Sequence, residues 1–281
     1  MRRRGRILNW EGGTLMGDEP QAWREEKVAV DDTSLIVERG GAGRPVLVLH
    51  DELGNPGWLK WTRTLAKRRT ILIPLHPGFG RTERAEWMLS IRDLAGFYSR
   101  YVKENGLAPV DVIGFSMGGW IAADMAASNP AQFRKLVLVA PTGIRPPAGD
   151  ILDIFQVMAP QQVIASVYNP ATTPEFGELY GGPMLPEQFE KFEEARAQTA
   201  RLAWIPYMHN PTLARLLGVA AGLPTLIVWG KQDAIVPVST AEAYRRAIGG
   251  ARVVTFDNCG HRPEIEKSAE FVREVEAFLA D

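Results

Sequence analysis

The pentapeptide Gly-Phe-Ser-Met-Gly at residues 114–118 places a serine where the sequence predicts a sharp turn between a strand and a helix. Residues 110–113 are mostly β-branched and apolar, as in a buried strand, and residues 119–127 have a helical pattern. A serine in Gly-x-Ser-x-Gly at such a turn is a nucleophile elbow, and the helix behind it favours negative charge. The pattern predicts a nucleophile at Ser116. The alternative is a glycine-rich turn that only packs the helix on the strand.

A serine hydroxyl needs a general base, and the base needs an acid that orients it. The chain has four histidines, which are His50, His76, His209 and His261. Three of them follow predicted strands, so position alone does not identify the base. Hydrolases built on such a sheet have the order serine, acid, histidine, and only His209 and His261 come after the serine. Asp233 directly follows the strand 224–229, so the order favours Asp233 as the acid and His261 as the base.

Strand-like and helix-like segments alternate along most of the chain. The predicted strands are 27–30, 34–38, 45–49, 70–75, 110–113, 135–139, 224–229 and 251–256. The predicted helices are 58–67, 91–105, 119–127, 239–248 and 268–279. This alternation predicts an α/β fold with a mostly parallel sheet and helices on both faces. No helix separates the first two strands, so we expect them to form an antiparallel hairpin at one edge.

The composition changes after the sixth strand. Prolines and aromatic residues become frequent, helical patterns cover 150–167 and 186–204, and no run resembles a buried strand. We therefore expect a helical lid at residues 143–222, inserted into a core made of residues 23–142 and 223–281. Ligands bind at the carboxyl edge of such sheets, which is the edge that the lid would cover. Residues 1–22 are expected to form a flexible extension.

Size and composition restrict the class of protein. The chain has 281 residues, 46% hydrophobic and 23% charged, with a net charge of −1. This balance gives no electrostatic reason to expect a nucleic acid or a membrane as a partner, and no apolar run approaches about 18 residues. The lone cysteine, Cys259, and the lack of an apolar stretch after Arg2-Arg3-Arg4 favour a cytoplasmic protein. A homodimer stays open.

Several segments together resemble the α/β-hydrolase family, in particular its lidded serine esterases and meta-cleavage-product hydrolases. They are Leu49-His50 after an apolar strand, Pro77-Gly78-Phe79-Gly80, the elbow, the run from Trp229 to Pro237, and Gly260-His261. The resemblance implies that Ser116 is the nucleophile, Asp233 the acid and His261 the base. It implies neither a metal nor an organic cofactor.

The resemblance also implies an oxyanion hole. One donor would be the backbone N–H of Met117, and the other, by position, the N–H of Glu52 in the loop after His50. Relatives usually have glycine after this histidine, whereas this chain has Asp51 and then Glu52. A carboxylate at Glu52 would oppose an oxyanion if it pointed inward, so its side chain either turns away or shapes substrate choice. His50 is expected to brace this loop, and His76 is expected to be structural.

The lid is expected to provide an apolar pocket. With His50, the candidate pocket residues are Met158, Tyr168, Trp204, Tyr207 and Met208. The predicted reaction is cleavage of a carboxylic ester of a small to medium apolar substrate through an acyl-enzyme.

Alternatives to ester cleavage remain. One is carbon–carbon bond hydrolysis of the meta-cleavage-product type, although Arg262 stands where those relatives usually carry tryptophan. A lactonase or a cofactor-free haloperoxidase-like activity also stays open. An alternative from a different class is a non-catalytic binding protein on a hydrolase fold.

Overall fold

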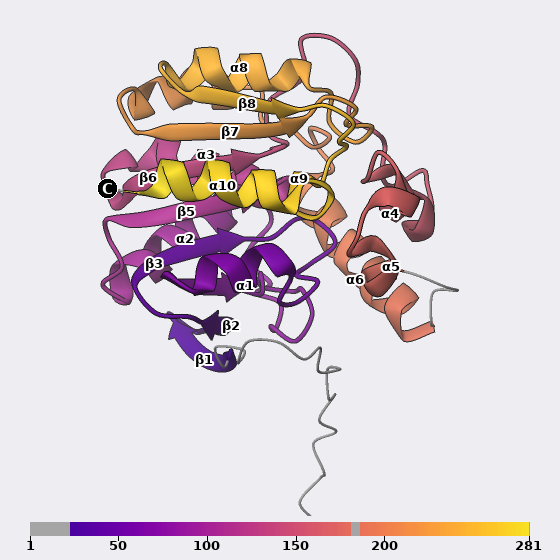
Figure 1. Ribbon diagram of the computed structural model, residues 1–281. Helices are drawn as coiled ribbons and strands as arrows, with labels where there is room; N and C mark the ends of the chain where they lie inside the picture. Colours follow the sequence, from indigo (N-terminus) through magenta and orange to yellow (C-terminus); the bar gives the residue numbers. More distant parts are fainter. Residues whose placement is uncertain (1–22, 181–185, 281) are drawn as a thin grey trace, which may run out of the picture.

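The computed structural model describes residues 23–180 and 186–280. The extension expected at residues 1–22 lies outside these ranges. The described residues form one eight-stranded sheet in the order β1-β2-β4-β3-β5-β6-β7-β8 (Figure 1). The strands are β1 (Arg24–Val30), β2 (Thr33–Gly40), β3 (Arg44–Leu49), β4 (Arg69–Pro74), β5 (Val110–Phe115), β6 (Phe133–Val139), β7 (Thr225–Gly230) and β8 (Arg252–Phe256).

The strand directions confirm the predicted sheet. Strands β1 and β2 pair antiparallel at one edge, and β2 also runs antiparallel to β4. The pairs from β4 through β3, β5, β6 and β7 to β8 are all parallel. The carboxyl ends of these parallel strands therefore meet at one edge, which is where the candidate catalytic residues lie.

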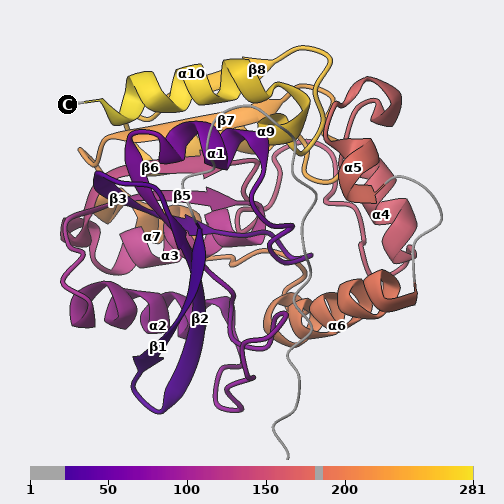
Figure 2. The same cartoon turned by 60° about the horizontal axis from the view of Figure 1, so that its bottom comes forward.

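Helices cover both faces of the sheet, as the sequence predicts. Helices α1 (Lys60–Ala66) and α10 (Ser268–Leu279) lie on one face, and α2 (Ile91–Glu104) and α3 (Met117–Ser128) lie on the other (Figure 2). The helix α8 (Ser239–Ile248) packs on the same face as α3. Side chains along each central strand alternate between the two apolar cores, and both sides are buried, which explains why these strands are unbroken apolar runs.

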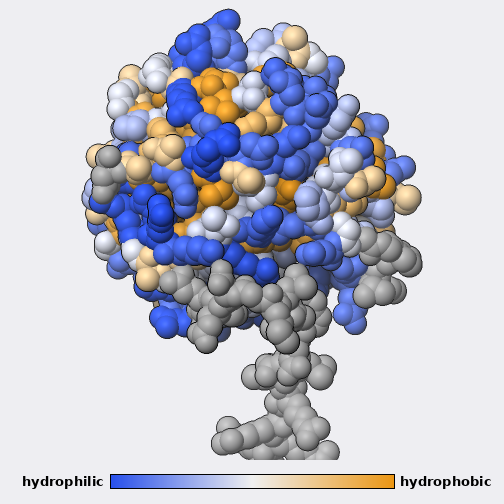
Figure 3. All heavy atoms as spheres, viewed as in Figure 1, coloured by the Kyte–Doolittle hydropathy of each residue, from blue (hydrophilic) through white to orange (hydrophobic). Residues whose placement is uncertain are grey.

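Short helices join or precede the larger elements. They are the 3₁₀ helix η1 (Pro130–Gln132) before β6 and the helix α9 (Pro263–Glu266) before α10. The face of the molecule shown in Figure 3 is mostly hydrophilic with scattered apolar residues, as on most folded proteins. Among the described residues, no helix has the length and apolar character needed to cross a membrane.

The described residues between β6 and β7 form helices and no strand. The elements are α4 (Ala159–Ala165), η2 (Pro170–Thr172), α5 (Phe176–Tyr180), α6 (Pro186–Ala203), α7 (Leu213–Leu216) and η3 (Leu217–Ala220). Helices α4, α5 and α6 lie beyond the carboxyl ends of the parallel strands (Figure 1).

One helix of this region is much shorter than predicted. The sequence predicts a helix over 150–167, but α4 covers only Ala159–Ala165. Pro160 occupies the first turn of α4, where a proline is tolerated, and it prevents the helix from extending backward through it. The preceding segment bonds to other parts of the chain instead, with the Leu152 amide donating to Ile235 O at 2.8 Å.

Candidate active site

Ser116 lies at the turn between β5 and α3 in a strained backbone conformation. Its φ is 46° and its ψ is −113°, a combination that costs a non-glycine residue on the order of 1–3 kcal/mol. The Ser116 amide donates to Val139 O on β6 at 2.9 Å, and its carbonyl accepts from Trp120 N at 3.1 Å. These bonds hold the turn between a strand end and the first turn of α3, which is the geometry that the motif predicts for an elbow.

The two flanking glycines are required by close backbone contacts. A Cβ on Gly114 would lie 2.5 Å from Gly118 O, and a Cβ on Gly118 would lie 2.2 Å from Leu49 O. No side chain fits at such distances. The glycines therefore allow α3 to approach β3 and β5 closely enough to present the serine at the sheet edge.

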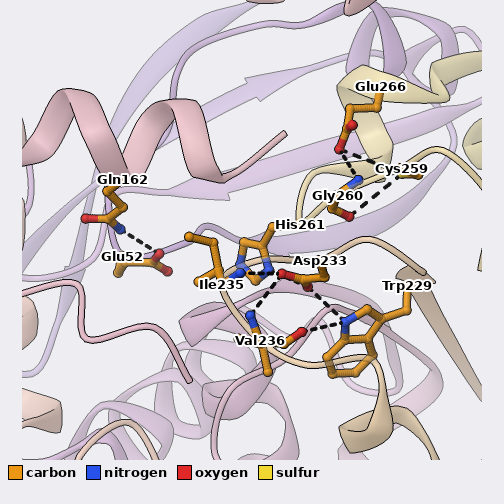
Figure 4. A network of polar contacts seen from close by, with 10 residues as sticks. All are labelled: Glu52, Gln162, Trp229, Asp233, Ile235, Val236, Cys259, Gly260, His261 and Glu266. Atoms are coloured by element: carbon orange, nitrogen blue, oxygen red, sulfur yellow. Dashed lines mark hydrogen bonds and ion pairs between the residues drawn. The ribbon is translucent and has the colours of Figure 1, made fainter. Parts of the chain in front are cut away.

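Asp233 and His261 meet at the same edge. Asp233 lies in the loop after β7, and His261 lies in the loop after β8. The Nδ1 atom of His261 lies 2.8 Å from Oδ2 of Asp233 (Figure 4). Because β7 and β8 are parallel neighbours, their loops carry the two residues to each other although 27 residues separate them.

Asp233 is fixed by three further donors. Its Oδ1 accepts from the amides of Ile235 at 2.8 Å and Val236 at 2.9 Å. Its Oδ2 accepts from Trp229 Nε1 at 2.9 Å as well as from His261. A carboxylate held this way can fix the orientation of the imidazole and leave its Nε2 directed away from the acid.

Carboxylates near His261 favour its charged form. Burial works against the imidazolium, but Asp233, Glu52 and Asp51 outweigh it and raise the pKa of His261 to about 9. The imidazolium that forms when a base takes a proton from serine is therefore well stabilised here. In the resting protein the same effect keeps most of the imidazole protonated near neutral pH.

The candidate reacting atoms are buried and have no hydrogen-bond partner among the described residues. Ser116 is 2% exposed and His261 is 6% exposed. Ser116 Oγ and His261 Nε2 both lack a hydrogen-bond partner within the described residues, so they do not bond to each other here. Such bonds are often long in unliganded enzymes and shorten when substrate binds.

The Glu52 side chain also enters this site. It is 3% exposed, and its Oε1 accepts from Gln162 Nε2 of α4 at 3.0 Å (Figure 4). Burial raises the pKa of the Glu52 carboxyl and the charge of Asp51 raises it further, while His261 and the Ser116 hydroxyl oppose this shift. Of the two orientations that the sequence leaves open, the carboxyl has the inward one.

The two predicted oxyanion donors belong to the elbow and to the loop after β3. Met117 is the first residue of α3, so its amide belongs to the first helical turn, which lacks intrahelical acceptors. The Glu52 backbone carbonyl accepts from Thr199 Oγ1 of α6 at 3.2 Å, which ties the loop after β3 to that helix. The sequence contains no motif that identifies Gln162 or Thr199, and only the folded chain brings them here.

His50 and His76 are engaged with the backbone. His50 Nε2 accepts from the His76 amide at 3.0 Å, so its Nδ1 carries the proton and donates to Asp51 O at 2.7 Å. His76 Nε2 donates to His50 O at 3.1 Å and its Nδ1 accepts from Tyr98 OH. Burial lowers the pKa of His50 to about 4 and also lowers that of His76, so both rings are neutral.

The other candidate pocket residues occupy different environments. Met208 is fully buried in an apolar core, and Tyr207 OH accepts from Ile154 N at 2.8 Å. Met158, Tyr168 and Trp204 are at least half exposed, and Trp204 packs against Phe155 with ring centroids 5.0 Å apart. The backbone next to Tyr168 approaches the candidate base, since the His261 amide donates to Ser166 O at 2.9 Å. Their role as pocket walls stays a prediction.

Comparison with known proteins identifies the family. A family model described as "Alpha/beta hydrolase family" matches residues 46–274. The chain belongs to the α/β-hydrolase family. As an α/β hydrolase, it is similar to a 2-hydroxymuconate semialdehyde hydrolase from Pseudomonas sp. (strain CF600), with 29% identity over 94% of this chain and 96% of that protein. It is also similar to a 2-hydroxy-6-oxo-2,4-heptadienoate hydrolase from Pseudomonas putida (strain F1), with 24% identity over 85% of this chain and 90% of that protein.

A solved structure with the same fold has a different assigned activity. A putative lipase from Acinetobacter baumannii AYE superposes with a TM-score of 0.73 and 25% identity, over 92% of this chain and 91% of that one. The proteins similar to this α/β hydrolase thus include a semialdehyde hydrolase, a heptadienoate hydrolase and a putative lipase. Family membership supports a hydrolase and leaves the substrate to be argued from the site.

Proposed function

We propose that this α/β hydrolase is a serine hydrolase that cleaves a carboxylic ester of a small to medium apolar substrate through an acyl-enzyme. One observation carries the proposal. His261 binds Asp233 through Nδ1 at 2.8 Å, while its Nε2 and Ser116 Oγ are both buried and have no partner in the described part of the chain. A substrate that brings the serine and the imidazole into contact would complete the set Ser116, Asp233 and His261.

The reaction would follow the usual course for such a set. Ser116 Oγ attacks the carbonyl carbon while His261 Nε2 takes the hydroxyl proton, and Asp233 stabilises the imidazolium. The Met117 and Glu52 amides donate to the oxyanion, a contribution of about 2.7–4 kcal/mol per donor to the barrier. His261 then protonates the leaving alcohol, and a water activated by the same imidazole cleaves the acyl-enzyme.

The helical region at residues 143–222 is proposed as the lid. Gln162 and Thr199 from this region bond to Glu52, which lies next to the nucleophile. The cover explains why Ser116 is almost inaccessible, and substrate entry would require these helices to move. The pocket walls proposed from this region are Met158, Tyr168, Trp204, Tyr207 and Met208, together with His50 from the core.

Carbon–carbon bond hydrolysis is the second candidate, favoured by the two Pseudomonas relatives. The name of the relative from P. putida describes a carboxylate substrate, a heptadienoate. In this chain Arg262, which follows the base, is already bound by Glu264 at 2.8 Å and by Tyr180 OH. Because these two bonds occupy its guanidinium group, Arg262 has fewer donors left to bind a substrate carboxylate. This favours ester cleavage over the hydrolysis of such a carboxylate substrate.

A substrate panel tests the proposal. Purified protein is assayed with p-nitrophenyl esters of increasing acyl length, with lactones, and with a vinylogous 1,5-diketone. We expect turnover of short and medium esters and at least a 10³-fold loss in Ser116→Ala, since removing a member of such a triad costs more than this. Turnover of the diketone alone would show that the protein cleaves a carbon–carbon bond and not an ester.

A further inference from the structure

The Glu52 carboxyl has one oxygen engaged and one without a partner. Oε1 accepts from Gln162 Nε2 at 3.0 Å, whereas Oε2 is buried and has no hydrogen-bond partner within the described residues. A buried polar atom left unsatisfied is costly, so its presence in a folded protein calls for an explanation, such as a catalytic role or a bound water or ion. The bond to Gln162 engages Oε1, whereas the Ser116 hydroxyl, which lies close enough to act on the carboxyl, forms no well-aligned hydrogen bond with Oε2.

This free oxygen belongs to the same small group as the reacting atoms. Ser116 Oγ and His261 Nε2 are likewise buried and lack partners among residues 23–180 and 186–280, and both residues influence the pKa of the Glu52 carboxyl. In Figure 4 the Glu52 carboxyl is drawn between Gln162 and His261, with Asp233 on the other side of the imidazole. Three buried polar atoms that lack partners among the described residues therefore lie near one another at the proposed reaction centre.

The surroundings of Glu52 disfavour a negatively charged partner. The charge of Asp51 raises the pKa of Glu52, and Asp51 also acts on His261 and Glu264. Arg262, the cation next to the base, is engaged by Glu264 and Tyr180. An oxygen of the Glu52 carboxyl can accept a hydrogen bond in this place, and a substrate carboxylate there would face the negative charge of Asp51.

We propose that Glu52 is a specificity-determining residue whose free carboxyl oxygen binds a hydrogen-bond donor on the substrate, a hydroxyl or an ammonium group close to the scissile carbonyl. The proposal rests on the proposed serine hydrolase function. Because the Glu52 backbone amide is the second oxyanion donor in that function, its side chain lies within a few bonds of the reacting carbonyl. The donor group therefore belongs on the α or β carbon of the acyl part or on the first carbons of the alcohol.

Four matched esters test the proposal. They are the p-nitrophenyl esters of 3-hydroxybutanoate, 3-aminobutanoate and 3-methylbutanoate, and the mono-p-nitrophenyl ester of succinate. In wild-type protein we expect kcat/KM to be about tenfold or more higher for the hydroxy or the amino ester than for the methyl ester, as for a hydrogen bond to a charged group. The succinate ester should be the poorest, and the better of the first two identifies the donor.

The variant Glu52→Gln tests the residue directly. Its amide oxygen can still accept from Gln162, which leaves an NH₂ group, a donor, facing the substrate. We expect the preference for the amino ester to disappear and the succinate ester to improve relative to the methyl ester. The control Glu38→Gln replaces a buried glutamate on β2, whose Oε2 accepts from Asn55 Nδ2 at 2.7 Å, and should leave the order of the four esters unchanged.

The outcomes separate the two proposals. Hydrolysis of all four esters by wild-type protein with rates within about threefold, or a preference for the succinate ester, would overturn the role of Glu52 and leave the serine hydrolase intact. The same order in wild type and Glu52→Gln would also overturn it. No hydrolysis of any ester, with a Ser116 that does not react with a fluorophosphonate, would overturn both.

Discussion

The residues around His261 predict an unusually alkaline pH dependence. The base must be neutral to take the serine proton, and Asp233, Glu52 and Asp51 raise its pKa to about 9. We therefore expect kcat/KM to rise about tenfold per pH unit from pH 7 towards pH 9 and then to level off. The measurement is a pH profile of kcat/KM with a neutral ester.

The variant Glu52→Gln gives the matched test. Removing one of the carboxylates that favour the imidazolium should move the rising limb to lower pH. Glu38→Gln, on β2, should leave it in place. A profile that is flat from pH 6 to 9 in wild type, with chemistry limiting the rate, would contradict the role of His261 as the base.

The contacts of Asp233 predict that its replacement strongly lowers the catalytic rate. In Asp233→Asn the oxygen can still accept from the Ile235 and Val236 amides, but the new NH₂ group would face the Trp229 and His261 donors. By analogy with the serine-protease triad, kcat should fall by about 10⁴-fold. Steady-state kinetics on a p-nitrophenyl ester measure it, and near-normal activity would place the acid elsewhere.

Among the secondary-structure elements, the turn between β5 and α3 should not tolerate a side chain at its flanking glycines. Gly118→Ala would place a Cβ 2.2 Å from Leu49 O, so we expect a loss of about 3 kcal/mol or more in the free energy of unfolding. Gly96→Ala is the control, because a Cβ there meets nothing within 4 Å on the exposed face of α2. This control should gain about 0.5–1 kcal/mol. Urea denaturation measures both, and an undiminished stability of Gly118→Ala would contradict the close approach of α3 and β3.

Local patterns predicted the elements that depend mostly on their own residues. The helix predicted at 268–279 is α10, and that predicted at 239–248 is α8, with the same bounds. The parallel sheet and its antiparallel edge hairpin also followed from the alternation of patterns. The helix predicted at 150–167 was wrong in its first nine residues, because Pro160 limits α4 and Leu152 bonds to a loop of the core.

The candidate site was only partly readable from the sequence. Ser116, Asp233 and His261 stand at strand ends in a recognisable order, so a pattern could identify them. The direction of the Glu52 side chain and its contact with Gln162, which is 110 residues away, depend on how α4 packs over the sheet. No spacing in the sequence encodes that contact.

At the scale of the whole molecule, the helices over the active site should open more easily than the sheet. Helices α4 and α6 are joined to the loop at Glu52 by two side-chain hydrogen bonds, whereas β5 is paired on both sides within the sheet. We expect backbone amides of α4 and α6 to exchange with deuterium faster than those of β5. Hydrogen-exchange mass spectrometry measures this, and equal protection of α6 and β5 would contradict the opening of a lid.

The proposed chemistry depends on Ser116 acting as a nucleophile that His261 activates. Reaction with a small fluorophosphonate probe, followed by peptide mass spectrometry, tests it most directly. We expect a covalent adduct on Ser116 in wild-type protein, much slower labelling of His261→Ala, and none in Ser116→Ala. An unlabelled wild type, or equal labelling of Ser116→Ala, would contradict it.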